Sequence, residues 1–122
     1  MSGTLARHTS ETARQAKAWD NFDGTFGTSP FTEANGGIRD SFNVTSITDR
    51  GTGRYTVNLT NAMASADYVV SATCGNGDGV DTSATHGIAN ETVLTSSAFG
   101  IRVSQNDTVI DKVFVSVIFF GE

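Results

Sequence analysis

The stretch that decides the fold is Val113-Phe114-Val115-Ser116-Val117-Ile118-Phe119-Phe120, close to the carboxyl end of the chain. β-Branched and aromatic residues dominate it, which favours a β-strand. Both sets of alternate positions are largely apolar, so one face can pack into a sandwich core while the other also needs a cover. That second face carries Phe114, Ile118 and Phe120, and each apolar side chain left in water forgoes about 1.5–3 kcal/mol of burial energy. We therefore expect another copy of the chain to cover it.

The rest of the chain predicts further short strands joined by turns. Apolar patterning indicates strands at 18–24, 38–47, 55–59, 67–74, 91–95 and 99–103, with a loop at 26–37 and turns at 75–81 and 105–107. Asp49-Arg50-Gly51-Thr52-Gly53 predicts a tight hairpin, because its glycines accept positive φ angles. With 122 residues, 13 glycines and one proline, the chain fits a single all-β domain, an antiparallel β-sandwich.

The charge of the chain argues against two classes of partner. The formal net charge is −5 and the pI is near 4.8. We interpret the basic residues as scattered along the chain; they are Arg7, Arg14, Lys17, Arg39, Arg50, Arg54, Arg102 and Lys112. Such a chain predicts neither a nucleic acid nor an anionic membrane as a partner. Cys74 is the only cysteine, so we expect no disulfide within the chain and no cysteine-rich metal site. We also expect no other metal site and no cofactor.

Residues 1–17 differ from the rest in being polar throughout, with almost no apolar face. Thr9 or Ser10 can cap a short helix there. We interpret 1–17 as an arm, extended or short-helical, that orders only against a neighbouring subunit or a larger assembly. Residues 18–122 are then the sandwich domain.

Two segments resemble a module from the carboxy-terminal part of tail-fibre proteins of phages and prophages. They are Ala16-Lys17-Ala18-Trp19-Asp20-Asn21-Phe22-Asp23-Gly24 and Ile38-Arg39-Asp40-Ser41-Phe42-Asn43-Val44-Thr45-Ser46-Ile47-Thr48-Asp49-Arg50-Gly51-Thr52-Gly53-Arg54-Tyr55-Thr56-Val57-Asn58-Leu59. The usual form of the module is AKAWVNFNGTG, a short gap, then IRDSFNVSSITDNGTGDYTVNF. This chain departs from it at Asp20, where Val is common, at Arg50 and Arg54, where Asn and Asp are common, and in a longer gap at 26–37.

The resemblance implies a non-enzymatic protein of the virion surface, made in the host cytoplasm and assembled as a homo-oligomer, most simply a trimer. Residues 1–17 would attach it to other virion proteins, and its loops would contact a bacterial surface glycan or protein. Because the module begins close to Met1, we expect a compact fibre-tip or receptor-binding protein. A capsid decoration, cement or head-fibre protein is the alternative. A polysaccharide depolymerase is a remote third, since no acid and base pair beside a groove can be argued.

The candidate ligand contacts lie in the loops 24–37 and 75–90. They are aromatic, amide, acidic and imidazole side chains: Phe26, Phe31, Asn35, Asp78, Asp81 and His86. We interpret both phenylalanines as exposed. The acidic turn around Asp78 offers oxygen ligands for Ca²⁺, but no complete calcium loop is present, so a solvated turn is the preferred interpretation. His86 has no partner at metal-ligand spacing.

The candidate oligomer interface consists of apolar residues from the first and last predicted strands: Trp19, Phe22, Phe114, Ile118 and Phe120. Trp19 can also stack on a sugar ring. We prefer to interpret it as a core or interface anchor, because it stands at the head of the module beside Phe22.

Overall fold

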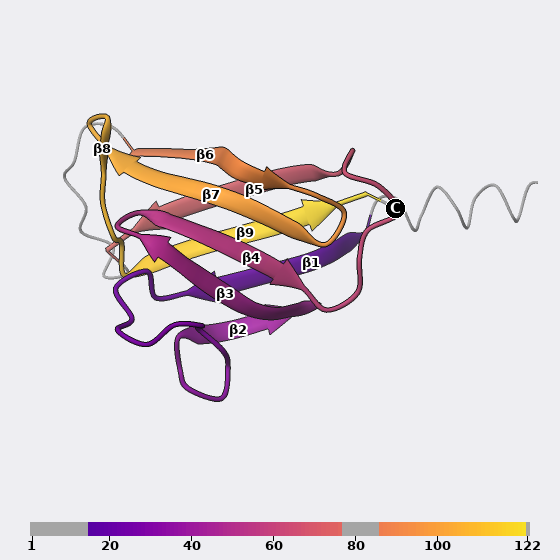
Figure 1. The fold of residues 1–122 in the computed structure, drawn as a ribbon, viewed down its shortest axis with the longest axis horizontal. Coiled ribbons are helices and arrows are strands. Elements are labelled where there is room, and N and C mark those ends of the chain that lie inside the picture. Colours follow the sequence, from indigo (N-terminus) through magenta and orange to yellow (C-terminus); the bar gives the residue numbers. More distant parts are fainter. Residues whose placement is uncertain (1–14, 77–85, 122) are drawn as a thin grey trace, which may run out of the picture.

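The computed structural model describes residues 15–76 and 86–121, which form two antiparallel sheets packed face to face (Figure 1). Sheet A has the strand order β2-β1-β9-β5, and sheet B has the order β3-β4-β7-β6 with β8 beside β7. The strands are β1 (Ala16–Phe22), β2 (Ile38–Phe42), β3 (Val44–Gly51), β4 (Arg54–Leu59), β5 (Val69–Gly75), β6 (His86–Leu94), β7 (Ala98–Gln105), β8 (Thr108–Val109) and β9 (Phe114–Phe120). The predicted all-β sandwich is therefore confirmed.

β9 lies in the middle of sheet A and shows the alternation that the sequence predicts. It pairs with β1 on one side and β5 on the other. Val115, Val117 and Phe119 are buried in the core, and the residues between them are half-buried on the outer face. Phe119 meets Phe99 of sheet B edge to face, with 5.9 Å between the ring centroids. This contact is one of many that join the two sheets into a single core.

The segment 38–47, predicted as one strand, forms two strands in different sheets. β2 ends and β3 begins on either side of Asn43, whose φ is 58°. Asparagine visits this left-handed region more readily than most residues. The Asn43 Nδ2 stabilises the passage of the chain from sheet A to sheet B by donating to the carbonyl oxygens of Lys17 at 3.1 Å and Asn61 at 3.0 Å. Apolar residues continue on both sides of the break, which is why their pattern predicts a single strand.

Two predicted turns are confirmed, and each depends on positive φ angles. Gly51 and Gly53, with φ of 124° and 68°, connect β3 to β4. The Asp49 Oδ1 accepts a hydrogen bond of 2.9 Å from the Gly51 N–H and closes that hairpin. Asn106 and Asp107, with φ of 51° and 64°, connect β7 to β8.

The sandwich begins two residues earlier than the sequence predicts. Ala16 already pairs with Phe120, so residues 16 and 17 belong to β1 and not to the arm. The remainder of the predicted arm, residues 1–14, lies outside the described residues. In the ranges 15–76 and 86–121, no helix is long and apolar enough to cross a membrane.

Candidate functional site

The structure presents one candidate binding surface on the outer face of each sheet. The first is a shallow groove of about 590 Å³ on sheet A. Trp19 lines the groove, and in the sheet register it is paired with Phe42 of β2 on one side and Ile118 of β9 on the other. The polar side chains along the groove are Asn21, Asp40, Ser71, Thr73 and Ser116. We call the row of Phe42, Trp19 and Ile118 the apolar row.

Four of the five candidate interface residues lie on this outer face, and one does not. Trp19, Phe114, Ile118 and Phe120 are half-buried there. Phe22 points the opposite way and is completely buried, with its ring 5.2 Å from that of Tyr55. The interpretation of Phe22 as an interface residue is therefore wrong: strand alternation puts it in the core of its own chain.

The candidate ligand contacts in the 26–37 loop pack or form hydrogen bonds within the protein. Phe31 is completely buried and pairs with Ile47 of β3, so its interpretation as an exposed ligand contact is wrong. Phe26 is half-buried and packs edge-on against Phe31 at 5.7 Å. Asn35 is exposed, but its Oδ1 accepts from the N–H groups of Thr32 and Gly37, and its Nδ2 donates to the Pro30 carbonyl. These aromatic and amide groups shape the loop.

The side chains of the other predicted ligand contacts lie outside what the structure describes. Asp78 and Asp81 lie outside the described residues. His86 begins β6 opposite Gln105, and only its backbone is described. Within 15–76 and 86–121, no group of three or more His, Cys, Asp and Glu side chains is positioned to hold a metal ion.

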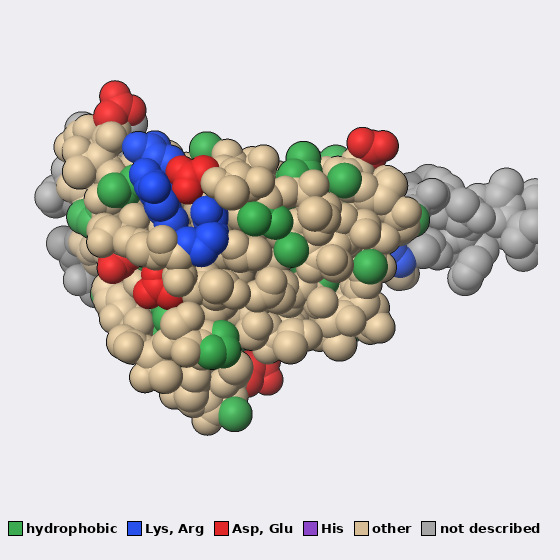
Figure 2. Space-filling model, viewed as in Figure 1, with side chains coloured by type: hydrophobic (Ala, Val, Ile, Leu, Met, Phe, Trp, Pro, Cys, Tyr) green, Lys and Arg blue, Asp and Glu red, His purple; other side chains and the backbone are tan. Residues whose placement is uncertain are grey.

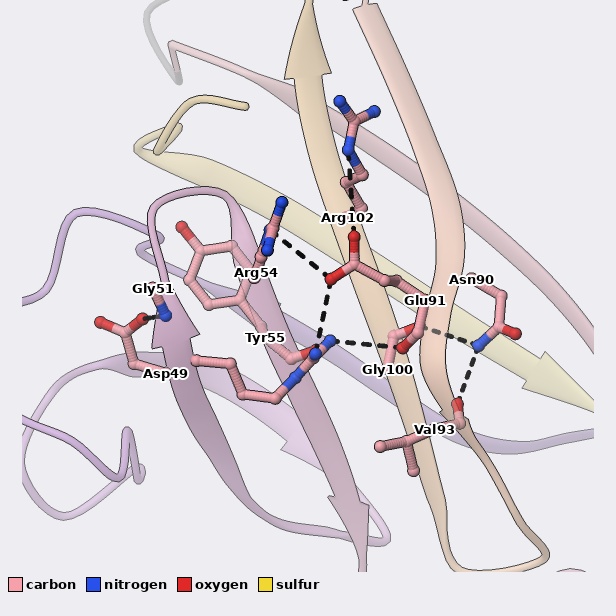
Figure 3. A network of polar contacts seen from close by, with 10 residues as sticks. Asp49, Gly51, Arg54, Tyr55, Asn90, Glu91, Val93, Gly100 and Arg102 are labelled. Carbon is pink, nitrogen blue, oxygen red and sulfur yellow. Dashed lines mark hydrogen bonds and ion pairs between the residues drawn. The ribbon is translucent and has the colours of Figure 1, made fainter. Parts of the chain in front are cut away.

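The second surface is a group of charged side chains on the outer face of sheet B, which we call the arginine cluster. It consists of Arg50, Arg54 and Arg102 around the carboxylate of Glu91 (Figures 2 and 3). The Glu91 Oε1 lies 3.5 Å from Arg50 Nη1 and 3.6 Å from Arg54 Nε, and Oε2 lies 3.9 Å from Arg102 Nε. Figure 2 shows these groups as the blue and red patch of this face. One carboxylate is thus shared among three guanidinium groups.

A bulge in β6 positions Glu91. The β6–β7 register shifts after Asn90, and Thr92 within the bulge has a φ of 67°. The Asn90 Nδ2 stabilises this conformation by donating to the carbonyl oxygens of Val93 at 2.8 Å and Gly100 at 2.9 Å. The sequence predicts only a short strand at 91–95, because the bulge interrupts the alternation of a strand that begins at His86.

Arg50 ties the two edge strands of sheet B together across its outer face. Its Nη2 donates to the Tyr55 carbonyl at 3.1 Å and to the Glu91 carbonyl at 3.3 Å. Gly100 makes this possible, because a Cβ there would collide with the Glu91 carbonyl and approach Arg50 Nη2 to 3.0 Å. The Arg50 Nε is buried without a hydrogen-bond partner in the described part of the chain. With 22% of its side chain exposed, Arg50 is the structural member of the cluster.

Arg54 and Arg102 form the accessible part of the cluster. They are direct partners in the β4–β7 register, and 48% and 33% of their side chains are exposed. Like charges directly opposite each other on a sheet face destabilise it. The Asp49 carboxylate forms no ion pair with the cluster among the described residues; its Oδ1 accepts a hydrogen bond from the Gly51 N–H, and it points away from the cluster (Figure 3).

The interpretation of the basic residues as scattered is wrong for these three arginines, which the fold brings together around Glu91. Arg50 and Arg54 flank one hairpin, and the β4–β7 pairing places Arg102 beside them. Long-range pairing of this kind is not visible in the order of residues along the chain. The available signal is that Arg50 and Arg54 stand where the tail-fibre module that this sequence resembles usually has Asn and Asp.

Asp20 is a buried acid without a hydrogen-bond partner in the described residues. It lies on the inward side of β1 with 2% exposure, opposite Ser41 and Val117, and both carboxyl oxygens are unsatisfied. Burial raises its pKa well above the usual value of 3.8. Neither of its register partners, Ser41 and Val117, is an acid or a base that could form a catalytic pair with it.

Comparisons with known proteins were made at the level of family, sequence and fold. No family model matches this chain, and no curated protein or solved structure matches it either.

Proposed function

We propose that this chain is a non-enzymatic surface protein of a phage particle, of the fibre-tip or receptor-binding type. The observation that carries the proposal is where the module-like segments lie in the fold. Segment 16–24 contains β1, and segment 38–59 contains β2, β3 and β4. They supply two adjacent strands to each sheet, as a single structural unit would.

The two outer faces support a division between assembly and recognition. Sheet A presents the apolar row, and on the same sheet Val69 of β5, opposite Phe120, is 64% exposed. An apolar face that the described residues leave partly exposed, on so small a domain, suits contact with further copies of the same chain. Sheet B presents charged and hydrogen-bonding groups that remain accessible to solvent, which suits contact with a polar ligand. Recognition is then expected on a strand face and not at the buried aromatics of the 26–37 loop.

Immunogold labelling of purified particles of a phage whose genome encodes this chain tests the proposal. An antibody against the folded protein is expected to label the tail or a fibre tip. Label confined to the capsid shell would replace the proposal with the capsid-decoration alternative. Purified particles that contain no copy of the chain, by labelling and by mass spectrometry, would overturn both.

A further inference from the structure

The arginine cluster carries positive charge that the described part of the chain leaves uncompensated. Three guanidinium groups and one carboxylate give these four side chains a formal charge of +2 at neutral pH, in a chain whose net charge is −5. Among the described residues, Glu91 is the only acid that forms an ion pair with any of the three. The fold thus holds like charges together on a solvent-facing strand surface, and their repulsion lowers the stability of the sheet.

The geometry of the pairs leaves most guanidinium donors available. Each arginine has five N–H donors in a planar arrangement that matches a carboxylate or a phosphate. Arg54 and Arg102 both approach Glu91 through Nε, at 3.6 and 3.9 Å, so neither forms a close two-pronged pair with it. The terminal nitrogens of Arg54 make no hydrogen bond to the described residues, and Arg102 uses Nη2 for a long contact of 3.3 Å to the Asp107 carbonyl.

We propose that the arginine cluster binds an oxyanion, a carboxylate or phosphate, carried by a saccharide of the bacterial surface. Arg54 and Arg102 contact the anion through their free donors. Arg50 positions Glu91 by donating to its backbone carbonyl. The need for an anion follows from the charge and the donors of the cluster. That a surface saccharide carries it rests on the proposed function.

Glu91 has a specific role in this site. Without a ligand, its carboxylate holds the three guanidinium groups within 3.5–3.9 Å of its oxygens and so reduces their mutual repulsion. When an external anion binds, it competes with Glu91 for Arg54 and Arg102. Glu91 therefore lowers the affinity for the anion while it orders the side chains that bind it.

A polyanion of the nucleic-acid type fits this surface poorly. Binding along a phosphate backbone requires several cations that neutralise successive phosphates. The cluster offers two accessible arginines, and the rest of the chain is acidic. A saccharide with spaced anionic groups and neutral hydroxyls avoids that repulsion.

Nuclear magnetic resonance titration of the full-length, ¹⁵N-labelled protein tests the proposal directly. The probes are D-glucuronate and D-glucose 6-phosphate, with D-glucose, acetate and inorganic phosphate as matched controls. Both anionic sugars are expected to shift the Nε–H signals of Arg54 and Arg102 at lower concentration than acetate or inorganic phosphate does, and D-glucose is expected to shift neither.

Three variants separate binding from structure. Arg54→Gln and Arg102→Gln are each expected to weaken binding of the anionic sugars about tenfold, because a charge-assisted pair is lost. Arg39→Gln makes the same charge change on sheet A, where Arg39 donates to Asn21 and Val113, and is expected to leave binding unchanged. A melting curve of each variant is the check that it remains folded.

Glu91→Gln gives the sharpest result. If Glu91 served only to order the arginines, removing its charge would weaken binding of the anionic sugars, whereas competition predicts tighter binding. Removing the competing carboxylate is expected to tighten binding about fivefold, the effect of roughly 1 kcal/mol between solvent-exposed charges. Weaker binding by folded Glu91→Gln would contradict the competition that we infer.

The remaining outcomes also distinguish the alternatives. No shift at the cluster with either anionic sugar would overturn the site. Acetate or inorganic phosphate binding as tightly as the sugars, or a short DNA duplex binding the cluster more tightly than they do, would overturn the saccharide assignment. Failure of the titration with label on the fibre tip would reject this inference alone, whereas absence of the chain from the particle would reject the proposed function and leave the titration result intact.

Discussion

Trp19 lies directly opposite Phe42 on the outer face of sheet A, and opposite Ile118 on the other side of β1. Phe42 is 53% exposed, and the other two side chains are half-buried. The apolar row thus crosses three adjacent strands without a full cover from the described chain. A contact between copies of the chain would remove it from water.

Replacing Phe42 with Ser should weaken self-association with little effect on folding. The side chain is largely exposed in one copy, so its loss costs little stability, whereas an aromatic anchor in an interface contributes about 2 kcal/mol or more. We expect the wild-type chain to run as an oligomer in size-exclusion chromatography with light scattering, and Phe42→Ser to shift toward the monomer. Leu94→Ser, at a 50% exposed site on sheet B, is the matched control and should leave the mass unchanged. A wild-type chain that stays monomeric at high concentration would contradict the interface.

Gly100→Ala should destabilise the protein by about 1–3 kcal/mol, because the added methyl group has no room. It would collide with the Glu91 carbonyl and press on the Arg50 guanidinium. Urea unfolding measures the loss. The control is Gly75→Ala in β5, where the added group meets nothing within 4 Å and stability should hardly change. Equal effects of the two substitutions would show that Gly100 is not needed for the path of Arg50 across the sheet.

Tyr55→Phe should cost about 1–3 kcal/mol, the usual result of leaving a buried acceptor unpaired. The Tyr55 hydroxyl lies 2.6 Å from the Asp111 carboxylate and 2.8 Å from the Gly24 carbonyl, and burial raises its pKa. Tyr68→Phe is the control: its hydroxyl is partly exposed and donates to the Thr95 carbonyl at 2.8 Å. Because water can replace that bond, denaturant unfolding should show a smaller loss. A larger loss for Tyr68→Phe would mean that Asp111 and Gly24 find other partners.

The parts of the fold that depend on local pattern were predictable from the sequence. The two-faced alternation of β9 and the glycines of the Asp49–Gly53 hairpin act over a few residues, and the structure confirms both. The change of sheet at Asn43 was not predictable in this way, because apolar residues continue across it. There, the side-chain hydrogen bonds of one asparagine decide the path.

The candidate sites depend on long-range pairing, so the sequence identified them only in part. Trp19 is expected at an interface from its place beside Phe22 at the head of the module-like segment, and Ile118 from the two apolar faces of the last strand. The two side chains do share one face. The loop position of Phe31 favours exposure, but its pairing with Ile47 buries it. The arginine cluster forms only when β4 and β7 pair, which the charge pattern along the chain does not reveal.

Asp20→Val should stabilise the protein at neutral pH by about 1–3 kcal/mol or more, because a buried, unsatisfied carboxyl group is removed. Burial raises the pKa of Asp20 above its usual value of 3.8, so the folded state holds this proton more tightly than the unfolded state does. The stability of the wild-type protein should then be highest below about pH 4, fall as the pH rises toward the folded pKa, and level off above it. The gain from Asp20→Val should grow over the same window.

Urea unfolding of the wild type, Asp20→Val and Asp20→Asn at several pH values between 4 and 7 measures this dependence. Asp20→Asn keeps the shape and polarity of the side chain but cannot ionise, so it should lose the pH-dependent part of the penalty and keep the cost of unpaired polar atoms. Its stability should therefore fall between those of the other two at neutral pH and approach that of the wild type at pH 4. A gain from Asp20→Val that is equal at pH 4 and pH 7 would mean that the Asp20 carboxylate gains a partner or solvent in the folded protein, against the burial seen on the inward face of β1.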